Sequence, residues 1–298
     1  MKVWIKRLVI GLVSLLVLAA AGVLVGSLQG DRKRQRQVDV AVQSVAWATD
    51  AEGLARGRYL FRSRGCAECH GADGAGHEFI NDGKGMRISA PNITSGGPVA
   101  QYTAQDWVRV IRHGVKADRH AAFLMPAEDY NRFTDTDVAA LVGYTRTLAP
   151  RTGGAAVVEL PIFVKALYGL GAIQDAAEKI DHSLPPAKAV AAAVNAQHGA
   201  YVANMCIGCH GTGLSGGAIP GVPPDWPAAA NITPGKGSVM PRYPDTQAFV
   251  AMLRSGKRPD GSAIKVMPFE SLRELDDTDT QALYAYLKTV PERDAGQR

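Results

Sequence analysis

The stretch Cys66-Ala67-Glu68-Cys69-His70 decides how this chain folds, and a second stretch of the same form, Cys206-Ile207-Gly208-Cys209-His210, follows it. All four cysteines of the 298-residue chain lie in these two pentapeptides. C-x-x-C-H is the pattern of c-type haem attachment. Two thiols so spaced can form thioether bonds to one edge of a porphyrin, and the histidine that follows then lies under the iron as its proximal ligand. The sequence therefore predicts two covalently bound haem c groups.

Other uses of paired cysteines fit these motifs less well. The two pairs of a zinc ribbon are about 15–20 residues apart, whereas here one pair ends at Cys69 and the next begins only at Cys206. A thioredoxin-like motif needs a βαβ setting, which the pattern does not indicate. Disulfides could form in an oxidising compartment, but they would not require a histidine after each pair. No further cysteine is available as a nucleophile or thiolate ligand.

The chain contains an internal repeat, because its motifs recur in the same order and at a nearly constant offset. Asn92-Ile93-Thr94 after the first haem motif corresponds to Asn231-Ile232-Thr233 after the second, and Met125-Pro126 corresponds to Met267-Pro268. Each half reads as a helix leading into C-x-x-C-H, a glycine-rich loop, a second helix, a Met-Pro loop and a closing helix. We expect the first and last helices of each half to pack on each other, in a mainly α fold.

Local signals place the ends of these helices. The first helix should begin near Thr49-Asp50-Ala51-Glu52 with a capping box. The closing helices should begin at Thr134 and at Asp276, each with an aspartate three residues on. The middle helices are predicted over residues 105–113 and 246–255, each ending at a glycine, Gly114 or Gly256.

Met125 and Met267 are the predicted second axial ligands of the two irons. They follow the proximal histidines His70 and His210 at similar intervals, and the proline after each methionine stiffens its loop. Met/His is an established axial pair of cytochromes c and raises the reduction potential. The alternatives are that the methionines fill the core, or that other side chains bind the iron: Met240 or Met252 in the second half, and His77, His113 or His120 in the first. His182 and His198 read as structural.

The N-terminus predicts a membrane helix. Leu8–Leu28 is an uncharged run of 21 residues, long enough to cross a bilayer. Lys2, Lys6 and Arg7 before it favour a cytoplasmic N-terminus, although the basic run from Arg32 to Arg36 counts against that orientation. A cleaved signal peptide ending near residues 19–21 is the alternative. Either reading exports the rest of the chain, so we expect it at the periplasmic side of a bacterial inner membrane.

The predicted organisation is a membrane anchor with a basic segment over 1–37, a first haem domain over 38–150, a linker over 151–189 and a second haem domain over 190–298. The linker contains an apolar stretch, Leu160–Ile173, too short to span a membrane. It should pack between the two domains or contact the membrane or a partner subunit.

The basic pI of the chain comes from its N-terminus. Residues 1–37 hold seven of the 33 basic side chains and one of the 28 acidic ones, which leaves 26 basic and 27 acidic residues for the rest. This balance gives no case for nucleic-acid binding. Four arginines precede the first haem motif, and they should form a solvated face or steer an acidic redox partner: Arg56, Arg58, Arg62 and Arg64.

These motifs resemble the multihaem cytochrome c subunits of membrane-bound alcohol, aldehyde and gluconate dehydrogenases, over residues 50–150 and 190–291. The shared pattern is C-x-x-C-H, Asn-Ile-Thr, a Met-Pro loop and an Asp-rich start to the final helix. The resemblance implies two tandem class I cytochrome c domains. It also implies a chain that passes electrons from a dehydrogenase or quinol-oxidising complex toward a terminal oxidase. Those subunits usually carry three haem motifs, and this chain has two.

Electron transfer without catalysis is the function that these ligands predict, because two filled axial positions leave no site for a substrate. The main alternative is a di-haem enzyme, such as a peroxidase with an open haem in the first domain or a thiosulfate-oxidising cytochrome. A haem-based sensor would need an output segment, and none is apparent.

Overall fold

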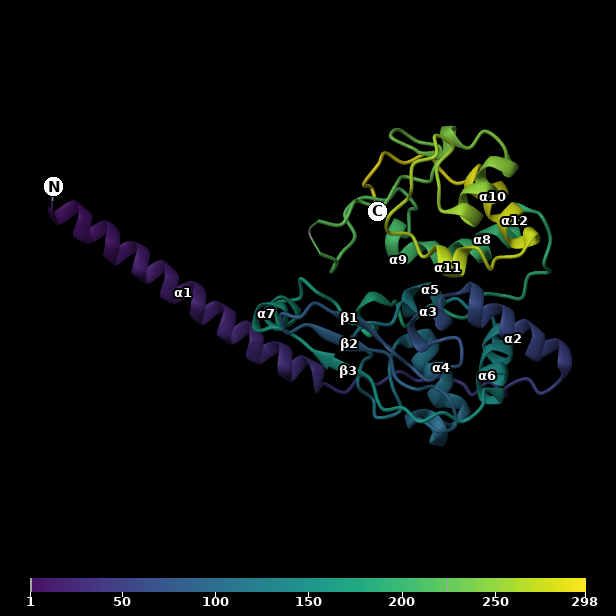
Figure 1. Cartoon of the computed structure of the whole chain (residues 1–298), viewed down its shortest axis with the longest axis horizontal. Coiled ribbons are helices and arrows are strands. Elements are labelled where there is room, and N and C mark those ends of the chain that lie inside the picture. Colours follow the sequence, from purple (N-terminus) through teal and green to yellow (C-terminus); the bar gives the residue numbers. More distant parts are fainter. Residues whose placement is uncertain (1, 224) are drawn as a thin grey trace.

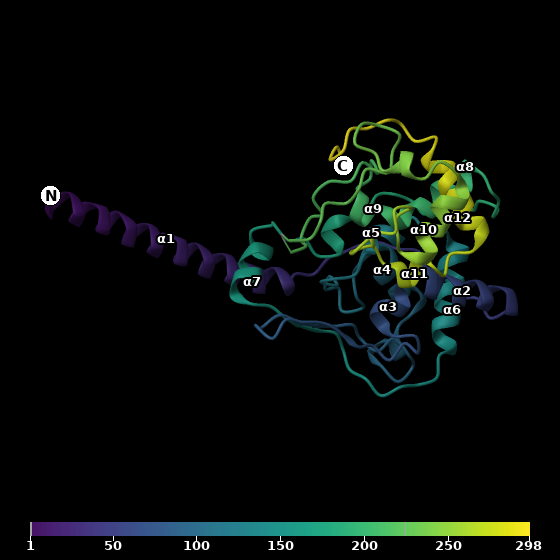
Figure 2. The same ribbon diagram turned by 45° about the horizontal axis from the view of Figure 1, so that its top comes forward.

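A computed structural model describes residues 2–223 and 225–298. One long helix, α1 (Lys2–Arg34), projects from two mainly helical domains that lie side by side (Figure 1). Figure 2 shows α1 projecting in the same way after rotation. The helix is long and apolar enough to cross a membrane, and its N-terminal two thirds are exposed along their length. The mainly α prediction is therefore confirmed for the described residues.

The domain nearer α1, called domain 1 below, holds the first haem motif and consists of these elements and 3-10 helices (η): α2 (Ala51–Ser63), α3 (Cys66–His70), β1 (Glu78–Asn81), β2 (Arg87–Ser89), η1 (Pro98–Gln101), α4 (Ala104–His113), α5 (Ala127–Tyr130) and α6 (Asp135–Thr147). Among its described residues, domain 2 repeats the helices without the strands: α8 (Ala196–Val202), η3 (Ala203–Cys206), α9 (Ile207–His210), η4 (Met240–Arg242), α10 (Thr246–Ser255), α11 (Phe269–Leu272) and α12 (Asp277–Leu287).

The helix ends lie close to where the sequence places them. The side chains of Thr134 and Asp276 cap α6 and α12 by accepting the backbone N–H three residues on. Gly114 ends α4 with a φ of 63°, a left-handed conformation that suits glycine. The start of α2 differs by one residue: Asp50 caps it by accepting the Gly53 N–H, so the expected capping box from Thr49 to Glu52 is wrong. Asp50, one position after Thr49, is the N-cap residue instead.

The first and last helices of each domain cross closely, as predicted. Gly57 of α2 lies against the backbone of Ala140 in α6, where an added Cβ would come within 2.0 Å of the Ala140 oxygen. Gly199 of α8 lies against Ala282 of α12 in the same way, at 1.9 Å. Each crossing therefore depends on a glycine in the middle of a helix, where glycine is otherwise unfavourable.

Residues 151–189 pack mainly on domain 1 and on α1, and Ile173 lies near Gly221 of domain 2. Strand β3 (Val157–Glu159) adds to β2 in an antiparallel three-stranded sheet of order β1-β2-β3. Helix α7 (Ile162–Gly169) then crosses the C-terminal end of α1 (Figure 1), and η2 (Ala177–Lys179) follows. The segment lacks a counterpart in the repeat because it serves the junction with α1.

Small residues and ion pairs hold α7 to α1. Gly26 and Gly30 of α1 lie against the backbone of α7, and Gly169 of α7 lies against the backbone of α1. Lys33 Nζ pairs with Glu178 at 2.8 Å, and Arg36 pairs with Asp175 at 2.7 Å; both acids follow α7. Two charges of the basic run are thus neutralised within the fold, which weakens that run as an argument about orientation.

Candidate haem-binding sites

A cavity of about 510 Å³ lies in domain 1, and Cys66, Cys69, His70 and Met125 all line it. This volume lies within the range of small-molecule and cofactor sites. Most other lining residues are apolar, among them Phe61, Ile88, Val99, Ile111 and Leu141. The structure therefore brings the four predicted binding residues of domain 1 to one apolar cavity, although His70 and Met125 are far apart in the sequence.

The proximal histidines of both domains are oriented in the same way. The Nδ1 atom of His70 lies 2.9 Å from the Pro91 carbonyl oxygen, and that of His210 lies 2.8 Å from the Ala230 oxygen. Donation from Nδ1 to a carbonyl leaves Nε2 as the nitrogen that can bind a metal. Burial lowers the pKa of both imidazoles, which keeps them neutral at pH 7.

The Asn-Ile-Thr motif holds those carbonyl groups in place. The side-chain oxygen of Asn92, which is fully buried, accepts hydrogen bonds from the backbone N–H and hydroxyl of Thr94. Its amide nitrogen donates to the Arg151 carbonyl oxygen, beyond the closing helix. Asn231 repeats this arrangement with Thr233 and the Arg293 carbonyl oxygen. The motif therefore ties the loop that orients each histidine to the chain that leaves each domain.

In domain 2, Cys206 and Met267 pack against one hydrophobic core. Both side chains are partly exposed, whereas Met240 and Met252 are only 5% and 6% exposed within that core. The positions of these two buried methionines suit core packing, which favours Met267 as the ligand candidate. Burial raises the pKa of the Cys66 and Cys206 thiols to about 12, so neither free thiol would be a thiolate at neutral pH.

The other histidines of domain 1 lie elsewhere. His113 contacts His182 through their Nδ1 atoms at 3.0 Å, His120 lies 3.3 Å from Asp118, and His77 stacks edge-on with Phe79. None of the three alternative ligands of domain 1 is among the residues that line the described cavity. This arrangement favours Met125 over them.

The cavity of domain 1 also suits the acidic groups of a haem. Trp107 lines it, and the indole Nε1 of this residue is buried and has no hydrogen-bond partner among the described residues. A buried donor without a partner is unfavourable, and a propionate carboxylate is an acceptor that would satisfy it. Arg34 and Lys116 line the same cavity and could offset the negative charge. Domain 2 has Phe249 at the position of Trp107, so the two sites differ here.

The two domains meet through a contact that is made twice. The Tyr59 hydroxyl of α2 donates to Asp279 of α12 at 2.7 Å, and the Tyr201 hydroxyl of α8 donates to Asp137 of α6 at 2.6 Å. Each hydroxyl also accepts the backbone N–H of the residue that caps the opposite helix, Asp276 or Thr134. Each domain therefore binds the start of the other domain's closing helix.

The haem motifs lie at this boundary as well. The backbone N–H of Gly208, inside the second motif, donates to Asp129 of α5 at 2.8 Å. The backbone N–H of Ser271 in α11 donates to Glu68, inside the first motif, at 2.6 Å. Helices α5 and α11 directly follow the two Met-Pro loops, so the helix after each loop lies against the haem motif of the other domain (Figures 1 and 2).

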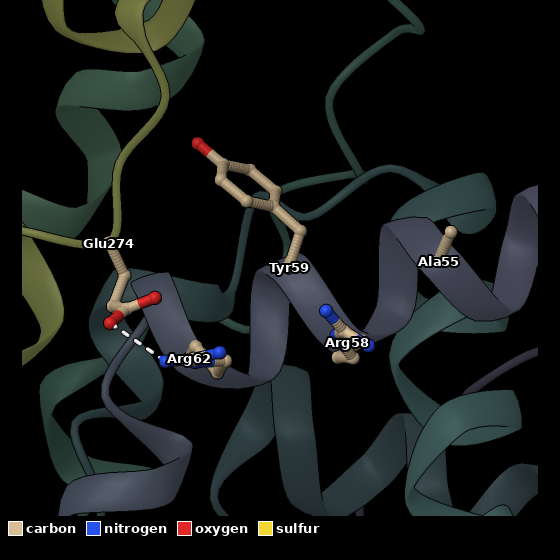
Figure 3. A pocket seen from close by; sticks show the side chains of 5 residues that line it. All are labelled: Ala55, Arg58, Tyr59, Arg62 and Glu274. Carbon is tan, nitrogen blue, oxygen red and sulfur yellow. Dashed lines mark hydrogen bonds and ion pairs between the residues drawn. The ribbon is translucent and has the colours of Figure 1, made fainter.

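Three of the four arginines before the first haem motif form ion pairs. Arg64 Nη2 contacts Asp279 at 2.7 Å with both side chains buried, and Arg56 contacts Asp137 at 2.8 Å. Arg62 contacts Glu274 of domain 2 at 2.9 Å beside a shallow hollow of about 350 Å³ (Figure 3). The pairs of Arg62 and Arg64 cross the domain boundary, and the prediction of a solvated face is wrong for Arg56 and Arg64.

Sequence reasoning missed the residues that join the domains. Tyr59 and Asp137 recur in the second half as Tyr201 and Asp279, at the same offset as the Met-Pro pairs and as the glycines of the two helix crossings. Their recurrence within the repeat was a usable signal, because a repeated polar residue on a buried helix face needs a partner.

Comparison with known proteins agrees with these sites. Residues 52–144 and 192–287 match the family described as cytochrome C oxidase, cbb3-type, subunit III. The chain is 30% identical over 277 residues to the fructose dehydrogenase cytochrome subunit of Gluconobacter japonicus, which covers 82% of this chain and 54% of that protein. It is 29% identical over 110 residues to the cbb3-type cytochrome c oxidase subunit CcoP of Helicobacter pylori, covering 37% of this chain and 32% of that one.

A third relative is the cytochrome c subunit of the quinone-dependent alcohol dehydrogenase of Komagataeibacter europaeus, 37% identical over 97 residues, 30% of this chain and 20% of that protein. The chain spans about half the length of the first relative and a third or less of the other two. Both matched stretches contain a haem motif with its Asn-Ile-Thr and Met-Pro elements. The chain therefore belongs to the family of cbb3-type cytochrome c oxidase subunit III, and resembles the cytochrome subunits of membrane-bound dehydrogenases.

Proposed function

We propose that this chain is a membrane-anchored di-haem electron carrier with one His/Met-ligated haem c in each domain. The observation that supports it most directly is the single cavity shared by Cys66, Cys69, His70 and Met125, together with the equivalent residues of the repeat: Cys206, Cys209, His210 and Met267. Each haem, when bound, supplies a one-electron couple at its iron.

The residues around each site fix the orientation of the ligands and restrict access to the iron. His70 and His210 are held by carbonyl oxygens, so their rings need no reorientation when the iron changes charge. The thioethers of Met125 and Met267 would be the second protein ligands of the two irons, and they would favour the ferrous state and so raise the reduction potential. With two protein ligands on each iron, no position would be left for a substrate, and the histidines that a peroxidase would require do not line the cavity.

The domain boundary supports transfer between the two haems. Each haem motif contacts the helix that follows the opposite Met-Pro loop, so the two sites lie on either side of one boundary. We propose that an electron enters at one haem and leaves from the other. Its donor would be a dehydrogenase or a quinol-oxidising complex and its acceptor a terminal oxidase, at the periplasmic side of the inner membrane, with α1 as the anchor.

A spectroelectrochemical titration of the purified full chain, with carbon monoxide added to the reduced form, tests this function. Two one-electron waves at high potential and no carbon monoxide complex are expected for two closed His/Met sites. One haem that binds carbon monoxide, or one wave at low potential, would contradict the proposal. The di-haem enzyme would then become the better description, and turnover with hydrogen peroxide would be the next measurement.

A further inference from the structure

Helix α7 and the residue that caps it carry large apolar side chains that neither α1 nor domain 1 covers. Ile162 and Phe163 at its start and Leu170 at its end are 55%, 59% and 65% exposed. The one charged residue of the helix is Lys165, and its Nζ reaches Asp31 of α1 at 3.0 Å. Among the described helices and strands, α7 makes its substantial contacts with α1. Three large exposed apolar side chains on one short helix point to a further contact surface.

The position of α7 along α1 suggests what covers this surface. It crosses α1 at Gly26 and Gly30, where the apolar run of α1 gives way to charged residues from Asp31 onward. A spanning helix leaves the hydrocarbon core where its apolar run ends. If α1 spans a bilayer, α7 therefore lies at the depth of the lipid headgroups and the upper acyl chains. Helices with one apolar face bind at this depth and turn that face toward the acyl chains.

We propose that α7 lies in the membrane interface beside the end of α1, with Ile162, Phe163 and Leu170 in lipid. Lipid is the favoured occupant because the apolar surface of α7 continues that of α1, where Leu24, Val25 and Leu28 are 53–54% exposed and need the same covering. The inference rests on the proposed function in one respect, that α1 spans the membrane.

A second contact with the membrane changes how domain 1 is held. Strand β3 pairs with β2 and leads into α7 after two residues, and Arg34 at the end of α1 lines the haem cavity. The walls of the cavity are thus joined to the membrane by two short segments of chain, one through β3 to α7 and one through the end of α1. Domain 1 cannot rotate freely about α1, and its haem stays close to the bilayer surface, within reach of a membrane-bound donor.

Nitroxide labels on the full chain with both haems, in phosphatidylcholine vesicles, test this placement. Labels are placed at Phe163→Cys and Leu170→Cys, with Val194→Cys as a matched control that is 55% exposed and lies just before α8. Val17→Cys, 61% exposed in the middle of α1, reports on the anchor. The unsubstituted chain, treated in parallel, shows whether the native cysteines take up label. Spectra are recorded with the haems in the ferric state, under nitrogen, with oxygen, or with a water-soluble nickel chelate, so that the constant effect of the irons cancels in the comparison.

We expect oxygen to relax the labels at positions 163, 170 and 17 more strongly than nickel does, and the reverse at position 194. Stronger relaxation by nickel at position 163, with position 17 still protected, would overturn the inference and leave the anchor standing. Protection of position 163 from both reagents would show a contact with a second copy and would also overturn it. Water access at position 17 would reject the anchor, and the inference with it.

Discussion

The two methionines are the residues whose replacement tests the sites most directly. Met125→Ala should open the iron of domain 1 to carbon monoxide and lower its potential, because a thioether that favours ferrous iron is lost. Met267→Ala should do the same in domain 2. The two changes should affect different waves of the redox titration. Met252→Ala is the control, since Met252 is buried in the core of domain 2 and should leave both waves in place. If Met252→Ala rather than Met267→Ala opened the second iron, the assignment would be wrong.

His113 gives domain 1 a predictable response to acid. Burial, and then the neighbouring His182, lower the pKa of His113 to about 4. The unfolded chain binds this proton near pH 6.5 and the folded chain only near pH 4, so the free energy of unfolding falls as the pH drops through that window. We expect a loss of about 1–2 kcal/mol between pH 7 and pH 5, because one pKa unit corresponds to about 1.4 kcal/mol. His113→Gln should remove this loss when unfolding by urea is measured at pH 7 and pH 5. An unchanged pH dependence in the variant would show that another group titrates.

At the scale of elements, the helix crossings rest on one glycine each. Gly57→Ala and Gly199→Ala place a methyl group against a backbone oxygen that cannot move aside without separating the two helices. Overpacking of this kind costs about 1–3 kcal/mol of unfolding free energy, even though alanine is the better helix former. Gly154→Ala, with nothing within 4 Å, is the control and should be neutral. Chemical denaturation of the three variants gives the comparison, and a stabilised Gly57→Ala would contradict the described packing.

The sequence predicts the elements far better than it predicts their contacts. Caps and closing glycines depend on local sequence, so α4 and α10 begin and end within a residue of expectation, and α6 and α12 begin within a residue of it. The haem motifs are equally local. Strand β3 and helix α7 could not be foreseen from the sequence. The three residues of β3 form a strand only because they pair with β2, far along the chain, where Ile88 lies opposite Val158. Helix α7 depends in the same way on its close packing against α1. The tyrosine contacts across the boundary depend on tertiary packing in the same way.

At the scale of the whole molecule, Asp279 makes more of the polar contacts between the domains than its counterpart Asp137 does. It accepts hydrogen bonds from Tyr59 and Arg64 of domain 1 and pairs with His198 at 2.6 Å. Burial alone would raise the pKa of Asp279, but Arg64 and these hydrogen bonds lower it to about 2. Its contribution to stability is therefore complete above about pH 4 and is lost only as the pH falls through about 2.

Asp279→Asn should weaken the docking of the two domains, since it leaves the Arg64 guanidinium buried without its counter-charge. A loss of about 3–5 kcal/mol is expected from thermal or urea unfolding, together with slower electron transfer between the haems in flash photolysis. Glu274→Gln is the matched control, because its partner Arg62 is half exposed and such pairs contribute under about 1 kcal/mol. Equal effects of the two substitutions would show that the buried pair has no special role.

The two equivalent tyrosine–aspartate contacts relate the domains as the subunits of a two-fold symmetric homodimer are related, although both domains belong to one polypeptide. In an isologous interface every contact occurs twice, so one copy can diverge while its twin keeps the subunits in register. The buried Arg64–Asp279 pair and the unpaired indole of Trp107 occur on one side alone among the described residues. If each half holds a haem as proposed, the two halves can differ around their irons, which the identical subunits of a homodimer could not do. A potential difference between the two centres would then give electron flow a direction.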